Sequence, residues 1–194
     1  MKFLRAYIED KIEINDTEWQ TIASYFCKTT YKKGVEIYSG GVCTKLYYLS
    51  EGVARSYMLT TEGKEITLGV HYRKKDETID PFIGDYISYL NGSESAIFCE
   101  ALQDCVLYES DFSKLELFYE SDIKYMKLAR KISDTLLVTI AKRIRETMRY
   151  TAKEKYAFVQ SLSPIYEEFL TDYQLASMIG VTAQSFSRLK NQEK

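Results

Sequence analysis

The chain has 194 residues, of which 45% are hydrophobic and 28% charged, and its formal net charge is −2. A chain of this length and composition can bury a core, which excludes a disordered, collagen-like or low-complexity protein. No apolar run approaches the roughly 18–20 residues that span a bilayer, and the charged start MKFLRAYIEDKIEI lacks the apolar stretch of a secretory signal. We therefore expect a soluble, cytoplasmic protein without a membrane partner.

Two residue counts limit the chemistry that is open to the chain. His71 is the single histidine, so a metal site with two or three histidine ligands from one chain is excluded. The cysteines form no CxxC pair, and their spacing matches neither a zinc ribbon nor an iron–sulfur loop. They are Cys27, Cys43, Cys99 and Cys105. Since no nucleophile–base pair is visible either, we predict a non-enzyme with no catalytic residues, no metal and no cofactor.

The first half of the chain predicts a helical start followed by short strands. A helical pattern covers residues 1–28, with Asn15 as the cap of its second part. Eight of the nine glycines then lie between residues 34 and 92, a density typical of tight turns. The runs with strand character are residues 35–38, 46–49, 53–60, 64–72, 96–102 and 105–108. Their spacing favours a sandwich or a small barrel.

The clearest strand lies at residues 64–72. Apolar residues at the even positions from 66 to 72 alternate with polar residues and glycine, which predicts a half-buried strand. His71 then lies on its polar face, where we expect it to be exposed. Residues 61–63, which end in glycine, predict the hairpin turn that joins residues 53–60 to this strand.

From residue 122 the apolar period changes to three or four residues, which predicts a helix over residues 122–148. Its apolar stripe consists of Tyr125, Leu128, Ile132, Leu136, Ile140 and Ile144. A helix of this kind is about 37 Å long, more than a small sandwich needs for cover. We predict that the stripe is a dimer interface, formed with the same helix of a second chain. Packing within one chain is the alternative.

Basic residues gather at the end of this helix. They are Lys142, Arg143, Arg145 and Arg149. Two interpretations stay open: these side chains contact DNA phosphates, or they form a solvated helix end that the helix dipole favours.

The last 25 residues predict two short helices around a tight turn. Thr171 or Asp172 can cap the first helix, Gly180 can end it in a left-handed conformation, and Thr182 can cap the second. Small and apolar residues occupy the positions where the helices meet: Leu175, Ala176, Ile179, Val181, Phe186 and Leu189. This spacing is typical of a helix-turn-helix; a helical hairpin with a merely solvated polar face is the alternative. The predicted DNA-binding residues are Thr182, Ala183, Gln184, Ser185, Ser187, Arg188 and Lys190.

Over nearly its whole length, the sequence resembles the Crp/Fnr family of bacterial transcription regulators, and most closely its short Bacteroidetes-type members. The segments that carry the resemblance are KKGVEI (32–37), LYYLSEG (46–52), VARSY (53–57), EGKEI (62–66), LASMIGVT (175–182) and SFSR (185–188). The first four are similar to the family's cyclic-nucleotide-binding β-roll, and the last two to its DNA-binding element. The resemblance implies an α+β fold with an antiparallel, jelly-roll-like β-roll as sensor domain.

The same resemblance implies three parts along the chain. Residues 1–115 correspond to the sensor domain with N-terminal helices, residues 116–150 to a long dimerisation helix, and residues 151–194 to a helix-turn-helix domain.

The family's cyclic-AMP binders carry a phosphate cassette of Gly-Glu followed by Arg-Ser or Arg-Thr. The matching residues, which we predict to line a degenerate effector pocket, are Gly84, Asp85, Glu94, Ser95 and Ala96. Asp85 stands for the ribose-binding glutamate, and Glu94 stands where an arginine would neutralise the phosphate. Because a carboxylate repels a phosphate, we expect an effector other than cyclic AMP.

Together these features predict a sequence-specific transcription regulator of the Crp/Fnr type that binds double-stranded DNA as a homodimer. An unidentified small-molecule effector and RNA polymerase are further candidate partners. By match with the family, the base-reading positions fall on Ala183, Gln184 and Arg188. The alternative is a ligand-binding or protein-interaction module with the cyclic-nucleotide fold that does not bind DNA.

Overall fold

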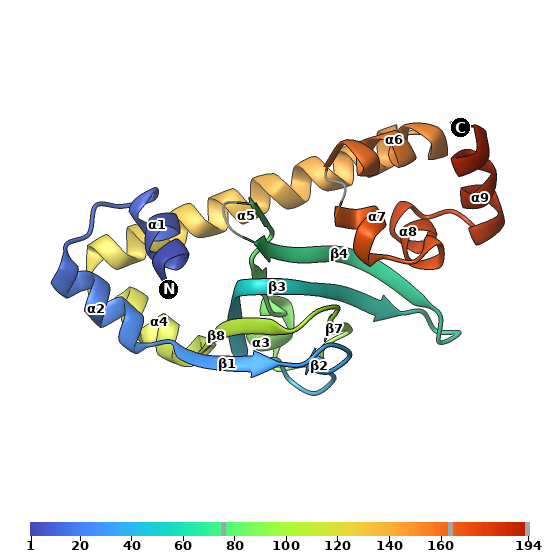
Figure 1. The fold of residues 1–194 in the computed structure, drawn as a ribbon. Helices are drawn as coiled ribbons and strands as arrows, with labels where there is room; N and C mark the ends of the chain where they lie inside the picture. The colour runs from blue at the N-terminus through green and yellow to red at the C-terminus, as the bar shows by residue number, and fades with distance from the viewer. Residues whose placement is uncertain (75–76, 163–164, 193–194) are drawn as a thin grey trace.

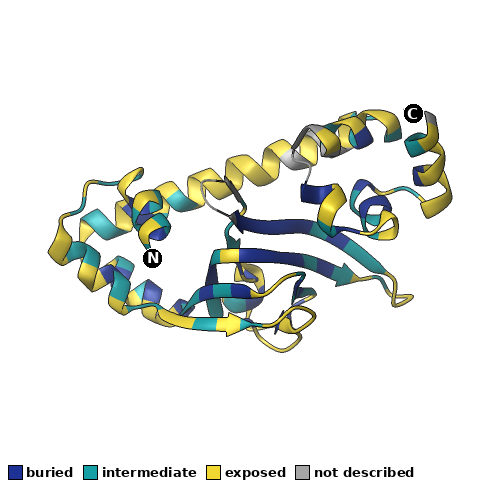
Figure 2. Ribbon diagram, in the orientation of Figure 1, coloured by how far each residue is buried: buried dark blue, intermediate teal, exposed yellow. Residues whose placement is uncertain are grey.

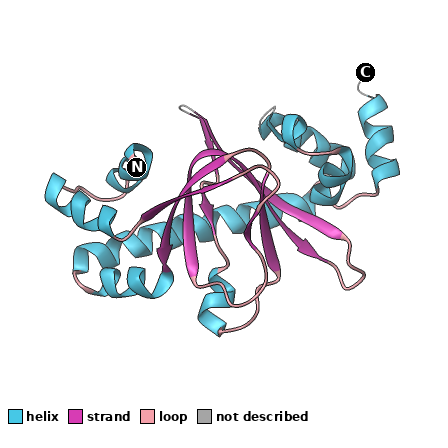
Figure 3. Cartoon of the chain, turned by 60° about the horizontal axis from the view of Figure 1, so that its bottom comes forward, coloured by secondary structure: helices cyan, strands magenta, loops and turns pink. Residues whose placement is uncertain are grey.

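A computed structural model describes residues 1–74, 77–162 and 165–192. The chain begins with two short helices, forms a rolled antiparallel sheet, and continues through one long helix into a group of C-terminal helices (Figure 1). Viewed from below, the rolled sheet lies between the N-terminal and the C-terminal helices (Figure 3). The predicted α+β class is confirmed.

The rolled sheet is built around one long strand, β3. The described strands are β1 (Cys27–Tyr31), β2 (Glu36–Tyr38), β3 (Lys45–Leu59), β4 (Glu65–Lys74), β5 (Glu77–Ile79), β6 (Phe82–Ile83), β7 (Ile97–Ala101) and β8 (Cys105–Asp111). The first half of β3 pairs with β8 and β6, and its second half pairs with β4 and β7. β3 therefore passes from one side of the roll to the other.

Gly52 lies at the bend of β3. One prediction about this part of the chain is wrong. The runs 46–49 and 53–60 were expected as two strands, whereas the structure joins them in one. Gly52 has a φ of +108°, a conformation open to glycine, so the chain bends without a loop. The register with β8 shifts between Leu49 and Glu51, as a bulge requires.

The β3–β4 hairpin turns where the sequence predicts. Gly63 adopts a φ of +76°, and the Thr60 hydroxyl accepts hydrogen bonds from the backbone N–H groups of Glu62 and Lys64. The prediction that the polar face of β4 is exposed is wrong. His71 is only 5% exposed, because both faces of β4 are covered.

Two helices precede the sheet, α1 (Lys2–Glu9) and α2 (Asp16–Ser24). Asn15 caps α2 as predicted: its side chain accepts from the Glu18 N–H at 2.9 Å, and the Glu18 carboxylate accepts from the Asn15 N–H at 2.8 Å. The helical pattern was expected to reach residue 28, but the chain is extended from Cys27 because β1 pairs with β8 there. Tertiary pairing thus overrides the local helical pattern.

The long helix α5 (Ile123–Arg149) confirms the helix predicted over residues 122–148. It follows α4 (Phe112–Glu120), and its first part packs on α1 and α2 in a common cluster with Phe118 and Leu128. Most of its remaining length is exposed, as the yellow ribbon in Figure 2 shows.

The C-terminal helices, which we call the head, are α6 (Ala152–Leu162), α7 (Ile165–Phe169), α8 (Asp172–Ile179) and α9 (Ala183–Gln192). They share one hydrophobic cluster with the sheet. The sheet contributes Val53, Val70 and Tyr72 to this cluster. The buried residues that the head contributes include Tyr156, Leu175 and Phe186. The head therefore packs against the face of β4 that carries Val70 and Tyr72, which is the apolar face that the sequence predicts to be buried.

Candidate nucleic-acid interface

The helix α8 has both of the end signals that the sequence predicts. Thr171 is its cap: the Gln174 N–H donates to Thr171 Oγ1 at 3.2 Å, and the Thr171 N–H donates to Gln174 Oε1 at 2.9 Å. Gly180 ends the helix in the left-handed conformation at φ +71°. The turn closes with a hydrogen bond from the Val181 N–H to the Ala176 carbonyl at 3.0 Å.

The helix α9 starts at the predicted cap, since the Ser185 N–H donates to Thr182 Oγ1 at 3.1 Å. Leu175, Ala176 and Ile179 of α8 and Phe186 of α9 are each at most 4% exposed, as the helix-turn-helix spacing requires. Tyr156 of α6 packs edge-on against Phe186, with 5.2 Å between the ring centroids. The predicted local structure of the helix-turn-helix is confirmed.

The predicted reading side chains form the outer face of α9. The exposed residues of this set are Thr182, Ala183, Gln184, Ser185, Ser187 and Arg188. In the part of the chain that the structure describes, Arg188 forms no ion pair. The Arg188 guanidinium is therefore open to an external partner.

Lys190 differs from the other predicted DNA-binding residues. Its Nζ lies 2.7 Å from Asp172 Oδ1, and this hydrogen bond raises the pKa of Lys190. The ion pair joins the end of α9 to the start of α8, so a phosphate has to compete with Asp172 for Lys190.

A polar chain joins the head to the sheet. The Ser177 hydroxyl of α8 accepts from the Thr67 N–H of β4 at 3.1 Å. Thr67 Oγ1 also accepts from Nη1 of Arg55 at 3.2 Å. Arg55 is only 1% exposed, and its guanidinium lies 2.5 Å from the Glu65 carboxylate and 2.7 Å from the Glu100 carboxylate. A buried cation with two carboxylates thus lies directly beneath the contact with the head.

The residues predicted to line the effector pocket are only partly brought together. Asp85 is 8% exposed: its carboxylate accepts from the Ser95 hydroxyl at 2.7 Å and from the Ser88 N–H at 3.1 Å. Gly84 immediately precedes Asp85, whereas Glu94 and Ala96 are exposed. The structure joins Asp85 to Ser95 and leaves the Glu94 carboxylate facing solvent.

The interior of the roll beside this cassette is filled with side chains. Tyr47, Leu49, Ile83 and Leu107 are buried there with Cys99, and Tyr31 and Tyr38 pack against them. Burial raises the pKa of Cys99 to about 12, so its thiol stays protonated at neutral pH and is a poor nucleophile.

His71 takes part in a contact that the sequence did not reveal. The Ser56 hydroxyl lies 2.7 Å from Nε2 of His71, and Nδ1 lies 2.6 Å from the Asp80 carbonyl oxygen. A carbonyl oxygen only accepts, so Nδ1 carries the proton of that bond. Fifteen residues separate Ser56 from His71, and only the hairpin register brings them together. Through these two contacts His71 of β4 connects Ser56 of β3 to Asp80, which follows β5.

The predicted apolar stripe of α5 does not face in one direction. Leu128 is 2% exposed and packs within its own chain, with Tyr125 and Ile132 partly buried beside it. Leu136, Ile140 and Ile144 are instead about half exposed, at 50%, 47% and 54%.

The physical reason is the pitch of the helix. Successive residues advance by about 100°, so each step of four residues rotates about 40° around the axis. Leu128 and Ile144 are therefore about 160° apart. The first part of the stripe therefore packs against other helices of the same chain. The second part is exposed, and the apolar residues Leu137 and Met148 are exposed beside it.

Within the described residues, no group of three or more His, Cys, Asp and Glu side chains is placed to hold a metal ion. None of the helices in the same described part is long and apolar enough to cross a membrane.

Solved structures share this arrangement. FixK2 from Bradyrhizobium japonicum superposes with a TM-score of 0.66 at 18% identity, covering 86% of this chain and 83% of that chain. The c-di-GMP responsive global regulator CLP of Xanthomonas campestris gives 0.66 at 13% identity, over 92% and 91% of the two chains. A transcriptional regulator of the CRP/FNR family from Thermus thermophilus gives 0.57 at 22% identity, over 86% and 84%.

The chain has the Crp/Fnr fold. No family model and no curated protein sequence matches it, so the likeness is one of structure.

Within this Crp/Fnr fold, local signals could find the helix-turn-helix but not the contacts that support it. Caps, a left-handed glycine and apolar spacing lie within one short segment and can be read from it. The Ser177–Thr67 bond joins residues 110 positions apart. The one sequence signal for this bond is the polar residue Thr67 in the middle of β4, and Thr67 alone does not indicate that Ser177 is the partner.

Proposed function

We propose that the protein is a transcription regulator, not an enzyme, and that it binds specific double-stranded DNA as a homodimer. The observation that supports this most directly is the outer face of α9. This face exposes amide, hydroxyl and guanidinium groups on a helix whose inner face is packed and whose start is capped. A second helix of this kind enters the major groove in helix-turn-helix proteins. RNA polymerase remains a further candidate partner.

The proposed reading residues follow from the chemistry of base edges. Gln184 can form a bidentate contact with adenine, and Arg188 with guanine. Ala183 offers only a methyl group, which suits the methyl of thymine. Ser187 is exposed beside them and can bind either a base or a phosphate oxygen.

Replacing Arg188 with alanine is expected to weaken binding to the preferred duplex by about 1–3 kcal/mol, because one guanine contact is lost. The preference at one base pair should relax. The measurement is a titration of wild type and Arg188→Ala against a duplex selected from a random pool and against a scrambled duplex, with thermal melting of both proteins.

The control is Lys190→Ala, which should weaken both duplexes alike with a shallower salt dependence. Arg188 would lose its assigned role if Arg188→Ala discriminated between the two duplexes as well as wild type does.

The proposed dimer uses the exposed part of α5. Leu136, Ile140 and Ile144 lie on one side of the helix, and their exposure leaves apolar area that a second α5 would cover. Leu128 is already occupied within its own chain, so the interface is proposed for the second half of the stripe.

We expect Ile140→Lys to convert the dimer into monomers, because it buries a charge at the interface; the dissociation constant should rise at least about 100-fold. Since Ile140 is 47% exposed within one chain, the monomer should stay folded. Sedimentation velocity at micromolar concentration measures the change.

Val138→Lys is the matched control. Val138 is 63% exposed on the same helix, yet it lies roughly 160° from Ile140 around the axis. Its substitution should leave the dimer intact. A monomeric wild type, or equal dissociation by both variants, would contradict the proposed interface.

We infer that the cassette is not built for cyclic AMP. Asp85 is engaged by Ser95 and Ser88, and the exposed Glu94 presents a negative charge where a phosphate would need a cation. The side chains of Tyr47, Leu49 and Ile83 occupy the neighbouring interior. These contacts support the proposal that this regulator is controlled by an effector other than cyclic AMP.

A further inference from the structure

The end of α5 carries a concave group of cations that the helix-turn-helix does not include. Lys142, Arg145, Arg149 and Tyr150 line a pocket of about 200 Å³. The first three are exposed. Three cations around one hollow form a surface suited to an anion that offers several oxygens.

Helix geometry separates this basic face from the proposed dimer interface. At about 100° per residue, Lys142, Arg145 and Arg149 fall within about 60° of one another around α5. Ile140 and Ile144 lie roughly 150° away from the middle of that group. The basic face therefore stays open to solvent when a second α5 covers the apolar part.

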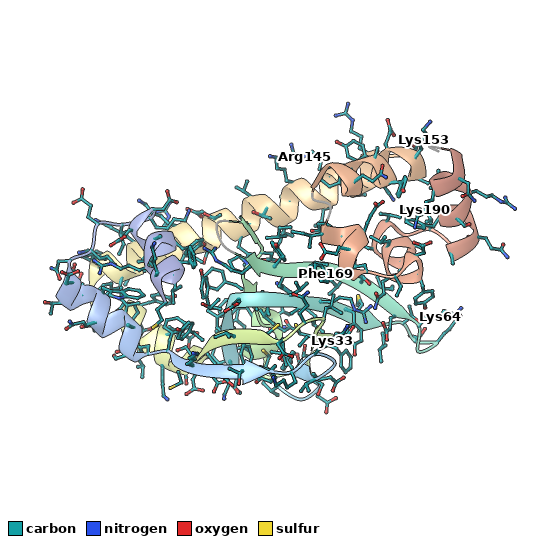
Figure 4. All side chains as sticks on the ribbon, in the orientation of Figure 1. Lys33, Lys64, Arg145, Lys153, Phe169 and Lys190 are labelled. Atoms are coloured by element: carbon teal, nitrogen blue, oxygen red, sulfur yellow. The ribbon has the colours of Figure 1, made fainter. Side chains whose placement is uncertain are left out.

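The same side continues into the head. Figure 4 shows Arg145 on α5 and Lys153 on α6 projecting from the same outer side of the two helices, away from the sheet. A cationic surface thus runs from α5 towards the head that carries the reading helix. Lys190 of α9 lies on the other side of α6 in the same view, where it pairs with Asp172 of α8.

Cations outnumber carboxylates along this surface, although the Arg149 charge lies near enough to the Glu154 carboxylate to help lower its pKa. Residues 142–155 include six lysines and arginines but only two glutamates. The Glu154 carboxylate accepts from the backbone N–H and the hydroxyl of Thr151, both at 2.8 Å, and these bonds lower its pKa. Among the described residues, Lys142, Arg145, Arg149 and Lys153 form no ion pair. The side chain of Arg143, the other basic residue predicted here, lies outside the described part.

We propose that Lys142, Arg145 and Arg149 bind backbone phosphates of the same duplex that α9 reads. The inference deepens the proposed function and rests on it. Guanidinium groups pair with phosphate oxygens through two parallel hydrogen bonds, and each neutralised phosphate releases a counterion. The basic face supplies affinity without sequence preference, whereas α9 supplies discrimination.

The test compares the double variant Arg145→Ala/Arg149→Ala with wild type on the selected and the scrambled duplex, over a range of salt concentrations. Both duplexes should bind more weakly to the variant by the same factor, about tenfold or more at low salt. The slope of log K against log salt should become shallower by about 1.8, since about 0.9 is lost for each phosphate contact. Discrimination between the duplexes should be unchanged.

Lys127→Ala is the matched control. Lys127 is exposed on the same helix, and the 18 residues that separate it from Arg145 correspond to five whole turns, so both point to the same side. It lies about 27 Å further from the head and should have no effect on binding. The conservative variant Arg145→Lys/Arg149→Lys should keep the wild-type salt slope. Circular dichroism and sedimentation check that each variant is folded and dimeric.

The outcomes separate this inference from the proposed function. If wild type binds no duplex, the proposed function fails and the inference fails with it. If wild type binds and the double alanine variant keeps both affinity and salt slope, the inference alone is overturned. An equal loss in Lys127→Ala would also overturn it, because the effect would then come from net charge rather than from this face.

Discussion

Replacing Gly52 with alanine is expected to lower the free energy of unfolding by about 3 kcal/mol or more, because two costs add at this position. The φ of +108° is strained for any residue with a Cβ atom. An added Cβ would also lie 2.5 Å from the Asp104 carbonyl oxygen and 2.9 Å from Cys105 Sγ. The oxygen belongs to the backbone of the β7–β8 turn, which cannot retreat as a flexible side chain would.

Gly63→Ala isolates the first of these costs. Gly63 has a φ of +76°, but an added Cβ meets no atom within 4 Å. Its substitution should cost only about 1 kcal/mol. Urea unfolding of both variants, followed by far-ultraviolet circular dichroism, measures the difference. An equal loss at the two positions would show that the close approach of the β7–β8 turn to β3 is unimportant.

Phe186→Ala is expected to cost about 3–5 kcal/mol, the range for a large cavity in a packed core. Phe186 is 1% exposed, and its cluster includes Val53, Val70 and Tyr72 of the sheet. Because the head and the sheet share this cluster, the loss should spread beyond the head. Trp19, the only tryptophan, packs in a different cluster with the N-terminal helices and reports on that distant region.

The unfolding midpoint should therefore fall both by circular dichroism and by Trp19 fluorescence. Tyr173→Ala is the control: Tyr173 is an aromatic residue of α8 that is 50% exposed, and its loss should change stability by less than about 0.5 kcal/mol. A fluorescence midpoint that stays unchanged in Phe186→Ala would show that the head unfolds independently of the sheet.

Several features could be predicted because their causes lie within a few residues. The caps at Asn15, Thr171 and Thr182 use side chains that bond to backbone N–H groups three residues away. Gly63 and Gly180 take the left-handed conformations that their turns require. The length and period of α5 likewise follow from its own residues.

The parts of the candidate site that could be predicted are those that depend on residues within a single helix. The outer face of α9 follows from helix periodicity once Phe186 is assigned to the inner face. The ion pair of Lys190 with Asp172 was not predicted, since it depends on how α9 crosses α8. The exposure of Ile140 beside the burial of Leu128 also needed the structure, because periodicity does not say which sector of a helix a neighbouring element covers.

The sequence by itself determined the long helix α5, the helix-turn-helix and the β3–β4 hairpin, since hydrogen bonds and side-chain spacing within one segment decide these. Only the tertiary structure decided that β4 is buried on both faces, and that His71 is therefore enclosed. It also decided that Arg55, Thr67 and Ser177 connect the sheet to the head. The reason is that burial and long-range hydrogen bonds depend on which surfaces meet, and no residue carries that information in its immediate neighbours.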